Sequence, residues 1–250
     1  MRITFLGTGT SVGVPMIGCQ CKTCVSADQR DQRLRASLLV EHNGQRLLID
    51  ASTDFRQQAL RIRLDHLDAI FITHCHADHV FGLDDIRPIN FRIGALPCFA
   101  SERTWQDLKQ VFGYIFKPSS YKALPKIVPH TLIGPFSLFG LTVEPLEVIH
   151  GRLPVTAFRI DSCAYVTDCN IIPDQTLERL LGLDLLIIDA LGRKEHPTHL
   201  SLPDSLKYIE RLKPKRALLT HISHDLKYET VSLELPPHVA LAYDGLQVET

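Results

Sequence analysis

Three histidines and one aspartate lie within six residues of the chain, at His74, His76, Asp78 and His79. They directly follow the apolar run 69–72, which predicts a buried strand. Side chains alternate along an extended segment, so His74 and His76 should point to the same side. Imidazole and carboxylate groups suit zinc, iron or manganese, and four of them exceed what one catalytic ion usually takes from a single loop. The spacing therefore predicts a pair of metal ions.

A second cluster consists of the thiols of Cys19, Cys21 and Cys24. The chain has seven cysteines, an odd number without a secretory context, which favours reduced thiols and metal binding over disulfides. Three thiolates at this spacing need one further ligand to complete a tetrahedron, and such a closed site is typical of structural zinc. We therefore expect one structural zinc ion here.

Composition limits the classes of function. The chain has 250 residues, of which 45% are hydrophobic and 22% charged, and its formal net charge is −1. This length suits one domain covering residues 1–250, and the charge provides no general field to attract nucleic acid. The first residues are interrupted by Thr4 and Gly7 too early for a signal peptide, and no apolar run could span a bilayer. We expect a cytoplasmic protein with no membrane or nucleic acid partner.

The pattern of apolar residues predicts the strands and helices of the chain. Short apolar or alternating runs predict strands, and an Asn-Gly pair at Asn43 predicts a hairpin. The predicted strands cover 2–6, 35–41, 46–50, 67–73, 142–149, 163–168, 185–189 and 216–220, with a terminal hairpin formed by 239–243 and 245–249. Helical spacing predicts helices over 53–62, 101–112, 173–181 and after Ser201. The aromatic region 87–126 could be either a substrate wall or a packed helical insertion.

The segment Thr73-His-x-His-x-Asp-His79 resembles the signature of the metallo-β-lactamase superfamily. That resemblance implies an α/β fold, a four-layer αββα sandwich with a binuclear site at one edge. Gly18-Cys-x-Cys-x-x-Cys24 resembles one branch of the superfamily, the PhnP-type phosphodiesterases encoded with the bacterial carbon–phosphorus lyase machinery. The resemblance covers essentially the whole chain.

The superfamily pattern implies a complete set of ligands for two divalent ions, manganese or zinc. It assigns His74, His76 and His150 to one ion, Asp78, His79 and His221 to the other, and Asp168 as the bridge between them. His130 is the competitor of His150, but it lies beside Pro129 before a predicted strand. Asp50, at the end of a buried strand, is expected to support the histidine loop.

The same resemblance assigns two further histidines. Thr198-His-Leu-Ser201 is similar to the loop that carries the general acid, so we expect His199 rather than His196 to be catalytic together with Asp168. His224 is expected to complete the cysteine site, and His42 is the alternative.

The branch implies a small phosphodiester substrate. Its family activity opens 5-phosphoribosyl 1,2-cyclic phosphate to ribose 1,5-bisphosphate during phosphonate catabolism. Two alternatives are a tRNA 3′-processing endonuclease of the same superfamily and a non-catalytic metal-binding scaffold. Hydrolysis of β-lactams or thioesters would use the same metals without His199, and a homodimer is left open.

Overall fold

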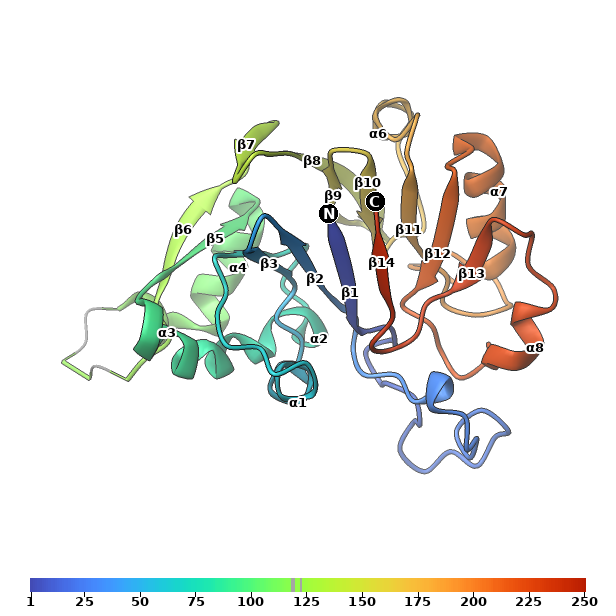
Figure 1. Ribbon diagram of the computed structural model, residues 1–250, viewed down its shortest axis with the longest axis horizontal. Helices are drawn as coiled ribbons and strands as arrows, with labels where there is room; N and C mark the ends of the chain where they lie inside the picture. The colour runs from blue at the N-terminus through green and yellow to red at the C-terminus, as the bar shows by residue number, and fades with distance from the viewer. Residues whose placement is uncertain (118–119, 122) are drawn as a thin grey trace.

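Two sheets of seven strands face each other, and helices cover the outer side of each (Figure 1). The computed structural model describes residues 1–117, 120–121 and 123–250. The strands of the first sheet lie in the order β14-β1-β2-β3-β4-β5-β6. Their bounds are β14 Gln247–Glu249, β1 Arg2–Gly7, β2 Ser37–His42, β3 Gln45–Ile49, β4 Ala69–Phe71, β5 Leu96–Ala100 and β6 Ile127–Thr131.

The second sheet has the order β13-β12-β11-β10-β9-β8-β7. Its strands are β13 Val239–Leu241, β12 Arg216–Thr220, β11 Leu185–Asp189, β10 Cys163–Val166, β9 Leu153–Ile160, β8 Leu141–His150 and β7 Phe136–Leu138. The helices beside the first sheet are α1 Phe55–Arg61, α2 Ala77–Val80, the 3-10 helix η2 Phe81–Ile86, α3 Arg87–Ile93, α4 Glu102–Val111 and α5 Gly113–Phe116. Those beside the second are α6 Asp174–Arg179, α7 Leu202–Leu212 and α8 Tyr228–Ser232, and a 3-10 helix η1 Gln29–Asp31 lies in the N-terminal segment.

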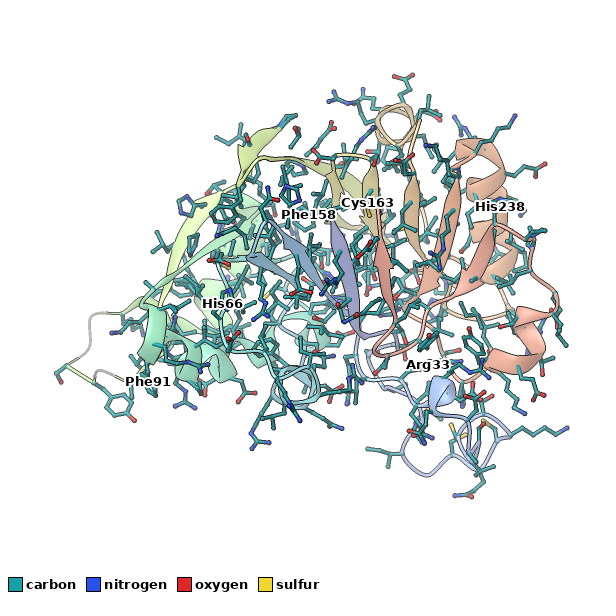
Figure 2. All side chains as sticks on the ribbon, in the orientation of Figure 1. Arg33, His66, Phe91, Phe158, Cys163 and His238 are labelled. Atoms are coloured by element: carbon teal, nitrogen blue, oxygen red, sulfur yellow. The ribbon has the colours of Figure 1, made fainter. Side chains whose placement is uncertain are left out.

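Three apolar clusters hold these layers together. One lies between the sheets and includes Phe158 (Figure 2), whose ring meets that of Phe71 edge to face at a centroid distance of 5.3 Å. Another packs the first sheet against its helices, with Trp105 buried in it. The third packs the second sheet against α6, α7 and α8, with Leu177 and Ile209 among its members. Four layers with three buried interfaces confirm the predicted α/β fold, an αββα sandwich.

Each sheet is antiparallel on one side and parallel on the other. The pairs β3–β4, β4–β5 and β5–β6 are parallel, as are β10–β11, β11–β12 and β12–β13. Helices connect the parallel strands, as such crossovers require. Because the carboxyl ends of parallel strands meet at one edge of a sheet, the residues that follow β3, β4, β10, β11 and β12 gather at one edge of the sandwich.

The two ends of the chain lie side by side (Figure 1). The amino group of Met1 donates to the Thr250 carbonyl at 2.9 Å, and β14 pairs with β1. The predicted terminal hairpin is therefore wrong, since β13 pairs with β12 in the second sheet while β14 joins the first. Apolar alternation indicated both strands correctly, but it carries no information on which sheet receives each of them.

Other predicted elements agree more closely. The strands 185–189 and 216–220 match β11 and β12, and the Asn43 hairpin joins β2 to β3. Ser101 caps α4 by accepting a hydrogen bond from the Thr104 N–H, as its position predicts. The region 87–126 contains α3, β5, α4 and α5, and Trp105 packs there in the core. Among the residues described, none of the helices has the length and apolar character needed to cross a membrane.

Gly82 offers a test of the packing beneath the histidine loop. A Cβ at this position would lie 2.1 Å from the Ser52 carbonyl oxygen and 2.5 Å from the Phe55 Cβ. We expect Gly82→Ala to lower the free energy of unfolding by about 1–3 kcal/mol, because neither backbone nor core can yield easily. Denaturant unfolding measures this. Gly134→Ala, where nothing lies within 4 Å, should change little, and equal losses in both variants would contradict the prediction.

Candidate metal centre

The first group of donors comes from the loop after β4 and from the end of β8. His74 Nε2 and His76 Nδ1 lie 2.9 Å apart, and His74 Nε2 is 3.8 Å from Asp168 Oδ2. The ring of His150 lies against both, with centroid distances of 5.8 Å to His74 and 5.1 Å to His76. One donor atom from each of the four residues falls within 4.8 Å of the others. The structure thus brings together the four residues expected around one ion.

The second group surrounds the other oxygen of Asp168. Asp168 Oδ1 lies 3.3 Å from His79 Nε2 and 3.2 Å from His221 Nε2. Asp78 Oδ2 lies 3.3 Å and 3.7 Å from the same two nitrogens. Each oxygen of Asp168 therefore faces one group, which is the arrangement that a bridging carboxylate requires.

The charges of this site favour a bound cation. Burial opposes protonation of His221, but Asp168, Asp78 and Asp189 outweigh it and raise the pKa of His221 to about 9. Burial likewise opposes protonation of His79, yet Asp168, Asp50 and Asp78 raise its pKa well above the ordinary value. The carboxylates thus attract positive charge strongly, and divalent cations would supply it in place of protons.

Two buried imidazole nitrogens also support a metal site. Among the described residues, Nε2 of His79 and Nε2 of His221 have no hydrogen-bond partner although they are fully buried. A buried nitrogen without a partner is costly, and a metal ion would use both lone pairs. The donor set therefore fits a pair of divalent cations.

Asp50 supports this site from behind. Its Oδ2 accepts a hydrogen bond from His79 Nδ1 at 2.7 Å, which leaves Nε2 of His79 to face Asp78 and Asp168. The Thr73 N–H donates to the other oxygen at 2.8 Å, and the Thr73 hydroxyl donates to Oδ2. Burial raises the pKa of Asp50, while these donors and His79 favour the charged form. The position agrees with the supporting role expected from the sequence.

Three residues of the site have a left-handed backbone, with φ of 62° at Asp50, 51° at Asp168 and 54° at His221. Asp50 and His221 directly follow a strand and Asp168 lies two residues after one, where the chain leaves the sheet edge. Residues other than glycine adopt this conformation at a cost, and it tends to occur where surrounding contacts fix a functional side chain. The turns therefore help to aim these side chains at one another.

His199 lies beside the second group and is oriented by Asp189. Its Nδ1 donates to Asp189 Oδ2 at 2.9 Å, and its ring lies between those of His150 at 4.5 Å and His221 at 4.8 Å. No role for Asp189 was predicted from the sequence. The signal was present, because Asp189 ends an apolar strand just as Asp50 and Asp168 follow one.

The turn after β8 connects His150 to the loop of His199. His150 Nδ1 donates to the Thr198 carbonyl at 2.7 Å, so Nε2 is the nitrogen left for a metal. Gly151 has a φ of 65°, and a Cβ there would lie 2.9 Å from Thr198 Cγ2. Glycine avoids both the cost of the left-handed backbone and this contact between the two loops.

The rejected histidines lie elsewhere or play no part in these groups. His130 belongs to β6, and its ring stacks on Phe99 at 4.8 Å. His196 is exposed; its Nδ1 bonds to the hydroxyl of Thr198, and its ring centroid lies 5.3 Å from that of His199 without a hydrogen bond to Asp189 among the described residues. His150 and His199, by contrast, lie against each other, with ring centroids 4.5 Å apart, beside the donor groups.

The cysteine cluster has the geometry of a tetrahedral site. His224 Nδ1 lies 3.2 Å from the sulfur of Cys19 and 3.5 Å from those of Cys21 and Cys24. Sulfur and nitrogen ligands at normal zinc bond lengths would be separated by about 3.5 Å in a tetrahedron. The backbone N–H of Cys24 lowers the pKa of Cys21 to about 6, which favours the thiolate that binds metal. His42 lies at the end of β2 beside Asn43, so the geometry favours His224 as the fourth ligand.

Fold and donor set together define a metallo-hydrolase. The chain belongs to the β-lactamase superfamily, whose domain model matches residues 45–222, and within it to the PhnP family. The assignment to the PhnP family follows from similarity to the crystal structure of a new diphosphatase from that family. It is 44% identical, has a TM-score of 0.94, and the match covers 100% of this chain and 97% of that one.

Two other proteins extend the comparison. An octanoyltransferase of Porphyromonas gingivalis is 41% identical over 252 residues, which cover 99% of this chain but 51% of that protein. The chain thus spans about half the length of this curated relative. Zinc-bound PqqB from Methylobacterium extorquens has a TM-score of 0.80 over 100% of both chains, but its 21% identity shows the fold alone.

The role of Asp50 can be tested by Asp50→Asn. An amide has one acceptor oxygen in place of two, so either His79 or Thr73 loses its partner. We expect metal affinity of the His79 group to fall about 10–100-fold, as is typical when a supporting carboxylate is removed. Metal titration by calorimetry measures the change. Asp68→Asn, at an aspartate that accepts from the Arg46 N–H near the start of β3, should leave the affinity unaltered; a similar fall there would contradict the prediction.

Proposed function

We propose that this chain hydrolyses a small phosphodiester with the help of two divalent cations and a histidine general acid. The observation that carries the proposal is the placement of His199. Its ring is held by Asp189 and lies directly beside both donor groups, next to His150 and His221. Membership of the PhnP family supports phosphoryl chemistry, because a member of that family is described as a diphosphatase.

The cations would be held by the residues already described. His74, His76 and His150 form one site, Asp78, His79 and His221 form the other, and Asp168 belongs to both. Manganese and zinc both suit these imidazole and carboxylate donors, whereas the thiols favour zinc. When bound, such ions lower the pKa of water and neutralise negative charge on phosphoryl oxygens.

His199 would supply the proton that the leaving oxygen needs. Because Nδ1 of His199 donates to Asp189, the other nitrogen, Nε2, is free to carry a proton toward the substrate. The carboxylate of Asp189 fixes the orientation of the ring, while the Cys169 N–H donates to the same oxygen at 3.1 Å. Asp189 is fully buried, so water does not compete for these bonds.

The proposed substrate is 5-phosphoribosyl 1,2-cyclic phosphate, in phosphonate catabolism. Water would add to phosphorus and the bond between phosphorus and the 2-oxygen would break. The 2-oxygen would take up a proton and become a hydroxyl, while the phosphate would stay on the 1-oxygen. The product is ribose 1,5-bisphosphate. An alkoxide is a poor leaving group, so protonation by His199 would matter most for this kind of ester.

A second candidate is hydrolysis of a phosphoric anhydride, favoured by the description of the family's diphosphatase. The same donor groups would serve, but phosphate leaves more readily than an alkoxide and depends less on His199. The match to half of an octanoyltransferase adds an octanoyl thioester as a third substrate to test. A thiolate also leaves without a general acid.

The two remaining alternatives, a tRNA endonuclease and a non-catalytic scaffold, have less support. A tRNA 3′-processing endonuclease would benefit from positive charge, whereas this chain has a net charge of −1. A non-catalytic scaffold would not need His199 and Asp189 beside complete donor groups. We therefore propose a small-molecule substrate without a nucleic acid partner.

The general-acid role predicts a dependence on the leaving group. His199→Ala should lower kcat on an alkyl phosphodiester by about 10²–10⁴-fold. On a nitrophenyl ester, whose leaving group needs little protonation, the loss should be much smaller. Steady-state kinetics on a series of esters with rising leaving-group pKa measures this trend.

His196→Ala provides the control, since His196 is exposed and its Nδ1 bonds to Thr198, whereas His199 bonds to Asp189. A loss of equal size for every leaving group in His199→Ala would argue against proton donation. Direct comparison of the cyclic ribosyl phosphate, a diphosphate, an octanoyl thioester and tRNA would identify the substrate class. Metal analysis of the purified protein, followed by reconstitution with manganese or zinc, would identify the ions.

A further inference from the structure

One short segment belongs to both proposed metal sites. His221 faces Asp168 and Asp78 in the second catalytic group, and His224, three residues later, faces the three thiols. Only Ile222 and Ser223 separate the two histidines. Any displacement of this segment would therefore move donors of both sites together.

The backbone of the segment is tied down on two sides. The Ile222 N–H donates to the Thr8 carbonyl at 2.8 Å, next to the end of β1. The Ser223 N–H donates to the Leu191 carbonyl at 2.9 Å, which lies in the loop that leads to His199. These bonds fix the N–H groups of the segment, and its carbonyls need other partners.

Arg33 supplies those partners. Its Nη1 donates to the Ser223 carbonyl at 2.8 Å and its Nη2 to the Leu226 carbonyl at 2.7 Å, so the guanidinium bridges both sides of His224. Nε donates to the Arg30 carbonyl at 3.3 Å in the segment that follows the cysteines. The side chain of Arg33 is completely buried where the N-terminal loop meets the segment before α8 (Figure 2).

Asp31 completes the arrangement. Its Oδ1 accepts from Arg33 Nη2 at 3.0 Å and from the Tyr228 N–H at 2.8 Å, and its side chain is also fully buried. The Arg30 guanidinium lies 4.2 Å above the Tyr228 ring. A buried ion pair contributes little net stability compared with apolar residues, but its directed hydrogen bonds can specify one geometry. Here the geometry specified is that of the segment from Ser223 to Tyr228.

The backbone of His221 depends on such supporting contacts. Its φ of 54° is strained, and strain of this kind persists only where neighbouring contacts hold it. The carbonyl held by Arg33 belongs to Ser223, two residues further along the chain.

We propose that Arg33, with Asp31, is a positioning residue that couples the cysteine site to the catalytic site through the segment 221–228. A cation held by Cys19, Cys21, Cys24 and His224 fixes the segment from one end, and Arg33 transmits this order to His221. Filling the cysteine site then raises the affinity of the His221 group for its cation, and the reverse holds by thermodynamic reciprocity. This inference rests on the metal-binding part of the proposed function and not on its substrate.

The test measures Co²⁺ binding without substrate. The visible absorption of Co²⁺ distinguishes thiolate ligands from imidazole and carboxylate ligands, so each site is titrated separately. Arg33→Lys keeps the charge but cannot bridge two carbonyls, because an ammonium lacks the planar fork of a guanidinium. We expect Co²⁺ affinity of the His221 group to fall about 10–100-fold, as when an outer partner of a ligand is lost.

Cys19→Ser, which weakens the cysteine site directly, should lower the affinity of the His221 group in the same way. The double variant should lose little more than either single one, because both act through the same segment. Arg35→Lys is the matched control: its guanidinium bonds to Asp54 and the Ser11 carbonyl, and within the described part of the chain it makes no hydrogen bond to the segment 221–228.

Three outcomes would overturn the proposal. Arg33→Lys could lower thermal stability yet keep full Co²⁺ affinity at temperatures where it is folded, which would mean a purely structural role. The double variant could lose the sum of both effects. If Arg33→Lys fails to fold, Cys19→Ser decides alone, and unchanged affinity of the His221 group would exclude coupling. None of these results depends on whether a phosphodiester is hydrolysed.

Discussion

The burial of four carboxylates at one edge of the sandwich is the constraint on which the rest of the structure depends. Asp50, Asp78, Asp168 and Asp189 are all buried, where an isolated charge is very costly. Asp50 and Asp189 accept hydrogen bonds from neighbouring residues, whereas Asp78 and Asp168 face the imidazoles of His79 and His221 and leave a demand for positive charge. Two facing sheets make this possible, since the parallel halves direct the ends of their strands to the same edge. The attraction for positive charge that results is the physical basis of metal binding here.

Much of this could be predicted from residues at the ends of apolar runs. The spacing of His74, His76, Asp78 and His79 indicated a metal pair, and the αββα layers followed from the family that this motif resembles. Apolar periodicity reports that a strand exists and which residues are buried, but not which sheet it joins. The last two strands were therefore paired wrongly. Local spacing does not report contacts between separate segments of the chain. It therefore left His42 open as an alternative to His224, and it did not indicate that Asp189 is the partner of His199.

The shared fold leaves the choice of substrate to residues outside the donor groups. A diphosphatase shares this architecture, and an octanoyltransferase matches this chain over about half of its own length. A pair of cations can assist attack on phosphorus and on carbon alike, so fold and metals do not define the bond that is broken. Under the proposed function, His199 and Asp189 are the more informative residues, because a general acid is useful only when the leaving group is poor.

The pairing of the two chain ends has a consequence for modular architecture. Met1 and Thr250 meet at the start of β1, whereas Thr8, just past the other end of that strand, contacts Ile222 beside the catalytic edge. A strand of six residues spans roughly 20 Å, so both ends emerge on the side opposite to the donor groups. A second domain fused at either end would therefore start from the same point and leave access to the site open. For the same reason, a short linker between the ends would produce a circular chain that could be reopened at an exposed turn such as Asn43-Gly44.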